Sequence, residues 1–326
     1  MEHLTIDSVL RPTEWNDYVG QGNIKKNLRI IIDAAKKRGS SCDHLLFYGQ
    51  AGLGKTTLAH LVAKDLNCNL KVTSGPALEK MGDLAAILSN LEERDVLFID
   101  EAHRLNKSIE EVLYPAMESR KLHLVIGKGP GARMVALDLP EFTIVAATTR
   151  PHLLSGPLRS RFGATFKLDF YDQEDMEAIV KRSADLLKLK MDVDAVAVLA
   201  KAARFTPRVA NRLVKRVRDY ADVYDYSEIS GEVAKKTLEL LEIDEMGLEP
   251  MDRRLLEVII KKFSGGPVGI NSLAAALNDD VGNIEDVYEP YLLSIGFLMR
   301  TSAGRVATPA AYQHLNLGKE KSGNLI

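Results

Sequence analysis

Residues 49–57, GQAGLGKTT, match the pattern G-x-x-x-x-G-K-[ST] and lie between an apolar run at 44–48 and a helical pattern at 55–66. In such a loop the glycines let the backbone turn tightly, so that consecutive N–H groups face phosphate oxygens, and the following helix adds its positive N-terminal end. The motif predicts a nucleotide site that uses Gly52, Gly54 and Thr57 in the loop, Lys55 at the β- and γ-phosphates and the Thr56 hydroxyl on Mg²⁺. The alternative is a glycine-rich turn that caps an ordinary helix.

A second apolar strand, VLFI at 96–99, ends in Asp100 and Glu101. A carboxylate at the exposed end of a buried strand can hold Mg²⁺ or its waters, and this is the role predicted for Asp100. Glu101 is predicted to orient and deprotonate the attacking water. Two acids after a strand are usually a helix cap, but beside a phosphate loop they favour hydrolysis over transfer to a substrate hydroxyl.

Three further side chains are candidates for contact with the phosphates. Thr149 lies at the end of a third apolar strand, where it can touch the γ-phosphate, although a threonine can also simply satisfy the strand end. Arg161 can spread transition-state charge when a neighbouring subunit supplies it. Arg208 begins a helix after Pro207 and can contact the phosphates from the lid side. For both arginines the alternative is an ordinary solvated charge.

The order of the predicted elements indicates three domains. Strands alternate with helices up to residue 171, which implies an α/β domain with a parallel sheet covered on both faces. Within it, 121–138 forms two alternating apolar runs around Gly127, Gly129 and Gly131, a hairpin pattern. Helices without strands predict a small helical lid at 172–246. Three helices and a two-stranded ribbon predict a winged helix at 247–326.

The ribbon of the predicted winged helix carries Arg300 and Arg305 on either side of its turn. Arginines in this position suit phosphate contacts that position a protein on DNA. Glu285 and Asp286 open the third helix and would repel DNA phosphates, so the wing is expected to make the main contact. The alternative is a protein-docking module, because the charges of this domain are balanced.

Composition limits the remaining classes of protein. Lys and Arg total 43 against 45 Asp and Glu, so the chain is not a polycation that coats nucleic acid by charge alone. Its only cysteines, Cys42 and Cys68, form no CxxC pair, which argues against a disulfide scaffold or a thiolate zinc site. The N-terminus lacks the layout of a signal peptide, and no apolar run approaches the roughly 20 residues that span a bilayer. We therefore expect a soluble intracellular protein.

With these motifs in order, the chain resembles AAA+ ATPases. Over nearly its whole length it is similar to the bacterial family of AAA+ motors that drive branch migration of Holliday junctions. The segments that carry this resemblance are LRPTEWNDYVGQ, GQAGLGKTT, LFIDEAHRL, LYPAME, ATTR, PLRSRFG, TPRVANRLVKRVRDYA, MDRRLLEVIIKKFSGGPVG, IEDVYEPYL and GRVATPAAY. The last four are specific to this family.

The resemblance implies roles for individual residues around ATP or ADP. Leu10, Arg11, Tyr18, Val19 and Pro207 would surround the adenine, with Tyr171 and Glu118 also at the nucleotide. Thr149 would be sensor 1 and Arg208 sensor 2. Arg161 would be the arginine finger that reaches the ATP of a neighbouring subunit, which explains why such motors assemble as hexameric rings.

The resemblance also implies partners. These are duplex DNA at Holliday junctions, contacted through Arg300 and Arg305, the junction-binding protein RuvA, and RuvC in the complex that resolves junctions. RuvA would dock on the 121–138 hairpin, with Val135 and Leu137 as contacts. Recombination, DNA repair and the SOS response in the bacterial cytoplasm would be the setting, with no membrane partner. Phe205 replaces the family's glycine before TPR, Ala102 replaces an isoleucine, and Ser119–Arg120 replaces an acidic–aromatic pair.

Two other readings share some of these parts. A protein-remodelling AAA+ ATPase usually needs an aromatic pore loop, and residues 69–97 contain no Phe, Tyr or Trp. A non-motor switch on DNA, such as an initiator or clamp-loader subunit, would also combine AAA+ and winged-helix parts. The 121–138 hairpin and the family-specific C-terminal segments count against it.

Overall fold

The computed structural model describes residues 6–126 and 133–317. The chain divides into two compact units: Met1–Ile179 with Thr206–Arg208, and Val180–Phe205 with Val209–Ile326.

The first unit is built on a five-stranded sheet whose strand pairs are all parallel. In spatial order its strands are β2 (Leu70–Ser74), β3 (Val96–Asp100), β6 (Thr143–Thr148), β1 (Leu45–Tyr48) and β7 (Ala164–Lys167). The three central strands are the apolar runs that the sequence predicts, since a parallel strand covered on both faces needs apolar side chains throughout. The predicted α/β class with a parallel sheet is confirmed.

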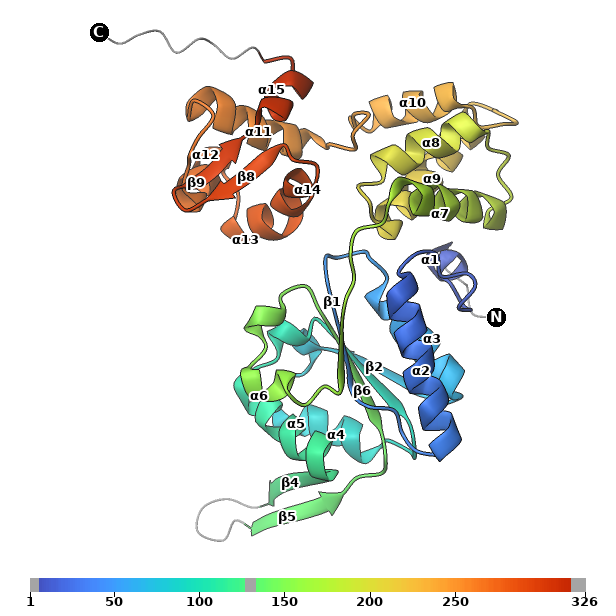
Figure 1. Ribbon diagram of the computed structural model, residues 1–326, viewed down its shortest axis with the longest axis vertical. Helices are drawn as coiled ribbons and strands as arrows, with labels where there is room; N and C mark the ends of the chain where they lie inside the picture. Colours follow the sequence, from blue (N-terminus) through green and yellow to red (C-terminus); the bar gives the residue numbers. More distant parts are fainter. Residues whose placement is uncertain (1–5, 127–132, 318–326) are drawn as a thin grey trace. The chain divides into compact units, whose positions relative to one another are not determined.

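Helices cover both faces of this sheet, with α2 and α3 on one side and α4 and α5 on the other (Figure 1). The helices of this unit are α1 (Ile6–Leu10), α2 (Gly22–Arg38), α3 (Lys55–Leu66), α4 (Met81–Ser89), α5 (Lys107–Ser119) and α6 (Gly156–Arg159). Helix α1 is a single short turn that buries Leu10.

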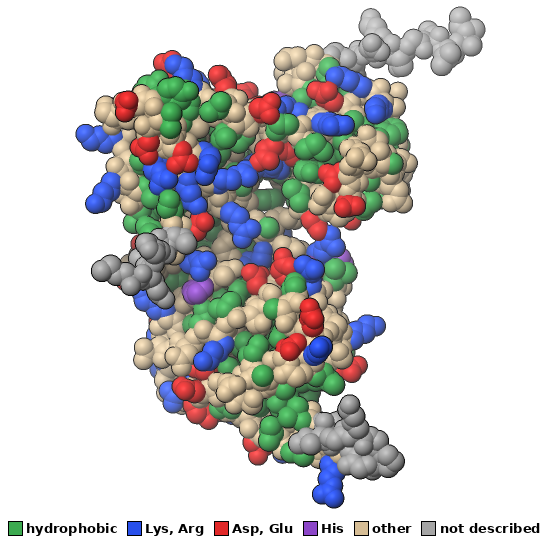
Figure 2. All heavy atoms as spheres, turned by 180° about the vertical axis from the view of Figure 1, so that it is seen from behind, with side chains coloured by type: hydrophobic (Ala, Val, Ile, Leu, Met, Phe, Trp, Pro, Cys, Tyr) green, Lys and Arg blue, Asp and Glu red, His purple; other side chains and the backbone are tan. Residues whose placement is uncertain are grey.

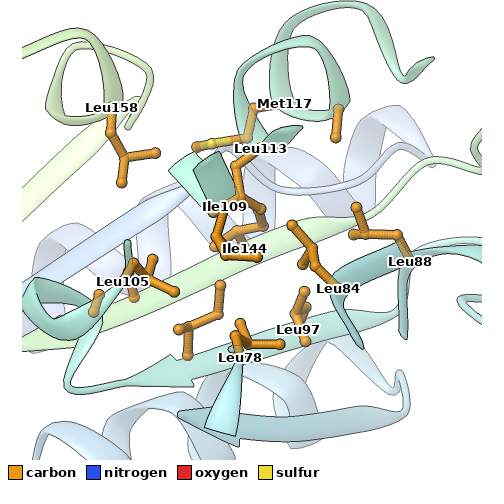
Figure 3. Packing of buried hydrophobic residues seen from close by; sticks show 14 of the residues in the cluster. Leu78, Leu84, Leu88, Leu97, Leu105, Ile109, Leu113, Met117, Ile144 and Leu158 are labelled. Atoms are coloured by element: carbon orange, nitrogen blue, oxygen red, sulfur yellow. The ribbon is translucent and has the colours of Figure 1, made fainter. Parts of the chain in front are cut away.

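The core on the α4 and α5 side shows how side-chain periodicity selects these elements. Ile109, Leu113 and Met117 recur every four residues along α5 and meet Leu97 and Ile144 of the sheet (Figure 3). All five side chains are buried. Since burying one such side chain stabilises a fold by roughly 1.5–3 kcal/mol, this face fixes α5 against the strands.

A two-stranded hairpin extends from the end of α5. Strand β4 (Lys121–Ile126) pairs antiparallel with β5 (Arg133–Asp138), from Lys121 opposite Asp138 to Ile126 opposite Arg133. The predicted hairpin pairing is therefore confirmed, while its glycine turn at 127–131 lies outside the described residues. Every residue of β5 is exposed.

The second unit contains the helical lid and a winged helix. The lid helices are α7 (Gln173–Leu186), α8 (Val193–Ala202), α9 (Pro207–Val223) and α10 (Gly231–Leu240). The first residues of α7, up to Ile179, belong to the first unit. The winged helix contains α11 (Pro250–Lys262), α12 (Ile270–Leu277), α13 (Val281–Asn283), a π-helix at Ile284–Tyr288, α14 (Glu289–Ser294), the ribbon β8 (Leu298–Thr301) and β9 (Gly304–Ala307), and α15 (Pro309–His314). Among the described residues, none of the helices has the length and apolar character needed to cross a membrane.

Candidate nucleotide site and winged-helix surface

The glycine-rich loop lies at the carboxyl edge of the sheet, between β1 and α3. Gly52 and Gly54 adopt φ angles of 85° and 101°, which L side chains rarely adopt, and a Cβ on Gly54 would lie 2.6 Å from the Tyr18 hydroxyl. The Lys55 ammonium donates to the carbonyls of Gly49 at 2.8 Å and Gln50 at 2.7 Å. Burial lowers the pKa of Lys55 to about 8, partly offset by Asp100. The loop therefore holds its cation inside the turn.

Strand β6 pairs with β1, and β3 pairs with β6, all in parallel, so the terminal residues of β3 and β6 lie at the same edge of the sheet as this loop. The Thr56 hydroxyl lies 3.3 Å from Oδ2 of Asp100, whose Oδ1 accepts the backbone N–H of Glu101 at 2.9 Å. A hydroxyl and a carboxylate are hard oxygen donors of the kind that Mg²⁺ selects, so the pair fits this ion. The structure thus brings together the two residues predicted as metal ligands.

Glu101 has a left-handed backbone with φ of 47°, which turns the chain sharply after β3. Its carboxylate is half exposed and lies 3.4 Å from Arg104 Nη1. Gly75, after β2, allows this turn, because a Cβ there would be 2.4 Å from the Glu101 carbonyl oxygen. The predicted base is therefore at the carboxyl edge with its side chain accessible to water.

A hydrogen bond that the sequence did not predict links the end of β6 to the segment after β3. Thr148 is buried, and its hydroxyl bonds to Nδ1 of His103 at 3.0 Å and accepts the N–H of Arg150 at 3.0 Å. Thr149, the predicted sensor, follows directly and is partly exposed. The only signal in the sequence was the position of His103, two residues after Glu101. This bond ties the strand end that carries Thr149 to the turn that carries Glu101.

Two tyrosines pack against the phosphate loop. Tyr18 and Tyr171 are both buried, their hydroxyls are 3.3 Å apart, and each hydroxyl donates to the Leu53 carbonyl, at 3.3 Å and 3.1 Å. Burial raises the pKa of Tyr171 to about 12, so both phenols stay neutral donors. Residues 18 and 171, which are far apart in sequence, therefore both lie against the phosphate loop.

The other residues expected around the nucleotide are placed as follows. Leu10 is buried, Val19 is partly exposed, and exposed Arg11 bonds to His60 Nε2 at 3.0 Å. Pro207 and Arg208 are the first residues of α9 and belong to the first unit. The Arg208 N–H donates to the Gly52 carbonyl at 3.4 Å, which places this helix start at the phosphate loop.

Arg161 and Glu118 lie together at the ends of α6 and α5. Arg161 Nη2 is 2.9 Å from Glu118 Oε1, its Nη1 donates to the Pro157 carbonyl at 2.7 Å, and its guanidinium lies 4.6 Å from the Tyr114 ring centre. Tyr114 is itself bonded to Ser155 at 2.8 Å. The structure thus pairs the residue expected at the nucleotide, Glu118, with the expected finger.

The two wing arginines are in different environments. Arg305 is only 8% exposed, donates to Glu289 Oε1 at 2.6 Å and to Glu285 Oε1 at 3.0 Å, whereas half of the Arg300 side chain is exposed. Arg300 also pairs with the fully buried Glu289. The face of the winged helix seen in Figure 2 carries side chains of both signs. Of the two arginines, Arg300 is the one that presents its charge to solvent.

Val135 and Leu137 lie on the same face of β5, because side chains alternate along a strand. Their exposed fractions are 36% and 39%. Two neighbouring apolar side chains on a projecting hairpin can bury area against a partner without any rearrangement of the core.

The parallel sheet, the phosphate loop at the end of β1, the acids at the end of β3, and the lid and winged helix that follow define an AAA+ P-loop ATPase. Three family models match successive parts of the chain: the Holliday junction DNA helicase RuvB P-loop domain at residues 10–168, the RuvB AAA lid domain at 171–244 and the RuvB C-terminal winged helix domain at 245–316. The chain belongs to the RuvB family.

Solved structures agree with this assignment. The Thermotoga maritima RuvB Holliday junction branch migration motor is 48% identical, with a TM-score of 0.88 over 95% of this chain and 99% of that chain. A singly substituted mutant of the same protein gives the same values. The family implies nucleotide binding and an ATPase of the helicase type that acts at Holliday junctions.

Proposed function

We propose that this protein is an ATP-driven motor that pumps duplex DNA and drives branch migration of Holliday junctions. The observation that carries the proposal is the cluster of Lys55, Thr56, Asp100 and Glu101 at one edge of the sheet, in a chain that ends in a winged helix. These residue types at this spacing suit hydrolysis of a nucleoside triphosphate.

In the proposed reaction, Lys55 moves from the loop carbonyls to the β- and γ-phosphates. Thr56 and Asp100 would hold Mg²⁺, which supplies positive charge against the phosphate oxygens when bound. Glu101 accepts the proton of the attacking water on its carboxylate while Thr149 orients that water. Arg208 contacts the phosphates from the start of α9.

A homohexameric ring completes this site. Arg161 would act in trans on the nucleotide of the neighbouring subunit, where a cation stabilises the charge that develops on the phosphoryl group. Gain or loss of the γ-phosphate would then bias the angle between the lid and the sheet domain.

Exposed surfaces support two of the partners that the resemblance implies. Arg300 offers a phosphate contact to duplex DNA. The apolar face of β5 suits RuvA, and RuvC would join the assembly that resolves the junction. We place this activity in recombination, repair and the SOS response in the bacterial cytoplasm.

Glu101→Gln tests the proposal most directly. The variant should keep ATP affinity within about threefold, because the amide retains the size of the side chain, and should lose turnover by at least about a hundredfold, because it cannot take the proton. ATP turnover is measured with and without duplex DNA, and strand displacement on a four-way junction with RuvA. Arg104→Gln, which removes the neighbour of Glu101 but no proposed catalytic group, is the control. Normal turnover by Glu101→Gln would refute the role of the base.

A further inference from the structure

A buried ion pair joins the lid to the winged helix within the second unit. Arg204 follows α8, and its Nη1 and Nη2 donate to the two oxygens of Asp252 on α11 at 3.0 Å and 3.2 Å. The side chains are 11% and 1% exposed. A two-pronged contact of this kind fixes direction as well as distance.

An aromatic side chain completes the contact. The Arg204 guanidinium lies 4.6 Å from the ring centre of Tyr291 on α14, and the Tyr291 hydroxyl donates to the Met246 carbonyl. The ring of Phe205 lies 5.8 Å from the same tyrosine. Arg204 therefore touches two different helices of the winged helix, while the Tyr291 hydroxyl holds the segment that connects the two domains.

The backbone at this point is held in a disfavoured conformation. Arg204 and Phe205 are consecutive non-glycine residues in the left-handed region, each with φ of 54°. Such residues persist where the surroundings determine them. The next three residues, Thr206–Arg208, already count with the first unit and include the proposed nucleotide contact. Arg204 is thus separated from this nucleotide element by a single residue, Phe205.

Other bonds hold the same junction. His314 lies 2.8 Å from Asp244, and Arg253 donates to the carbonyls of Leu248 at 2.7 Å and Glu242 at 2.8 Å. These contacts bind the end of the lid to α11 and α15. They involve partly exposed side chains, whereas the Arg204–Asp252 pair is buried and depends on both of its members.

We propose that Arg204, Asp252 and Tyr291 form a clamp that makes the lid and the winged helix one rigid lever, so that a movement begun at Arg208 reaches the wing undiminished. This rests on the proposed motor function for its purpose, but the rigidity is a property of the chain alone. The three are positioning residues, since Arg204 contacts the other two and none of them is assigned a contact with nucleotide or DNA.

The chemistry of the pair explains why a charged clamp is specific. Burial raises the pKa of Asp252, and Arg204 opposes that shift. Removing either partner leaves the other charge buried without compensation, while removing both leaves only apolar surface. The pair therefore favours one orientation of the winged helix over others that would separate the charges.

The test is a distance measurement between spin labels at Val193→Cys in the lid and Lys262→Cys in the winged helix, both exposed sites, with Cys42→Ser and Cys68→Ser in the background. The full chain should give one narrow distance distribution that is the same without nucleotide, with ADP and with a non-hydrolysable ATP analogue. Asp252→Asn should at least double the width of the distribution. Arg212→Gln, which removes the exposed ion pair with Glu249 across the same junction, should leave it unchanged.

A second variant covers the case in which Asp252→Asn fails to fold. Arg204→Met with Asp252→Leu removes both charges, so it leaves no buried charge unpaired, and it should also broaden the distribution. A wild-type distance that changes with nucleotide, or variants as narrow as wild type, would overturn the clamp.

Activity measurements on the double variant then test whether the clamp couples ATP hydrolysis to strand displacement. Basal ATP turnover and duplex affinity of the double variant should stay within twofold of wild type, while strand displacement per ATP hydrolysed falls at least tenfold. Unchanged displacement per ATP would refute the coupling role. If the wild-type chain showed no turnover or displacement at all, the proposed function would fail, and the distance measurement would still decide on rigidity.

Discussion

Arg161 Nη2 lies 2.9 Å from Glu118 Oε1 within one subunit. The arginine also lies over the ring of Tyr114, and its Nε is buried without a hydrogen-bond partner among the described atoms. Since α5 is fixed by its buried face, Tyr114 and Glu118 set the direction of the guanidinium from the same rigid helix. An arginine that acts on a neighbouring site needs such support, because its own nucleotide does not orient it.

We expect Arg161→Ala to abolish ATP turnover, by about 10³-fold or more, while each subunit keeps ATP affinity. Mixing this variant with Lys55→Ala subunits should restore part of the turnover, since Arg161→Ala sites then receive an intact finger from the other chain. Turnover at several mixing ratios is the measurement. Glu118→Gln keeps the arginine finger and should lower ATP turnover by less than about tenfold, because half-exposed ion pairs contribute about 1 kcal/mol or less. If mixing restores nothing, the in-trans role is refuted.

Substitutions of the two wing arginines should differ in their effects, with Arg300 affecting mainly DNA affinity and Arg305 mainly the stability of the winged helix. Arg300→Ala should reduce the slope of log K against log salt for duplex binding by about one, and it should lower the free energy of unfolding less than Arg305→Ala does, because Arg305 still pairs with Glu289. Arg305→Ala removes the partner of a fully buried Glu289, so it should lower the free energy of unfolding of the winged helix by about 3 kcal/mol. The measurements are a salt titration of binding and thermal unfolding of each variant.

Lys262→Ala, an exposed cation at the end of α11, serves as the control for the salt titration. It should change the slope less than Arg300→Ala does. A contrary result would be an Arg305→Ala variant that has wild-type stability and reduces the salt slope of duplex binding as much as Arg300→Ala does. Arg305 would then contact DNA directly, and the network around Glu289 would not be structural.

The hairpin face can be tested with matched neighbours. Val135→Ser and Leu137→Ser together should abolish binding to RuvA, with a change in the free energy of unfolding within about 0.5 kcal/mol per site, because both side chains are already exposed. Met134→Ser lies on the opposite face of β5 and should keep binding. Titration calorimetry with RuvA measures this. If Met134→Ser lost as much RuvA binding as the double variant, the binding face of β5 would have been assigned wrongly.

Much of the sheet domain could be predicted from the sequence because its central strands are apolar on both faces. Strands β2 and β7 could not be predicted in this way, since they lie at the edges of the sheet and their side chains are only half-buried or exposed. The turn of α1 is too short to show a helical period. Phosphate-loop chemistry was predictable because its residues are consecutive.

Sites assembled from distant residues were not predictable in the same way. The pairing of Arg305 with Glu289 joins a strand to a helix, and a wing arginine in sequence gives no sign of whether a buried acid will hold it. The bond between Thr148 and His103 spans 45 positions. Such contacts depend on which strands lie side by side, which becomes known only once the sheet order is known.

His44 should make the stability of the first unit depend on pH. It accepts the N–H of Ile144 through Nδ1 at 2.9 Å, so its proton is on Nε2, which faces the Met117 carbonyl at 3.3 Å. Burial lowers the pKa of this ring below its ordinary value of about 6.5. The unfolded chain therefore takes up the proton first. The contribution of His44 is complete above pH 6.5 and is lost as pH falls towards the folded pKa, by at most about 1.4 kcal/mol per pH unit.

Urea unfolding followed by the fluorescence of Trp15, the single tryptophan and a member of this unit, measures the effect between pH 5 and pH 8. His44→Asn retains an acceptor for the Ile144 N–H but cannot titrate, so its free energy of unfolding should vary less with pH than that of wild type. His152→Asn replaces an exposed histidine and should reproduce the wild-type profile. A His44→Asn profile as steep as wild type would show that other groups control the acid sensitivity, because in that variant no imidazole remains at the start of β1 to take up the proton.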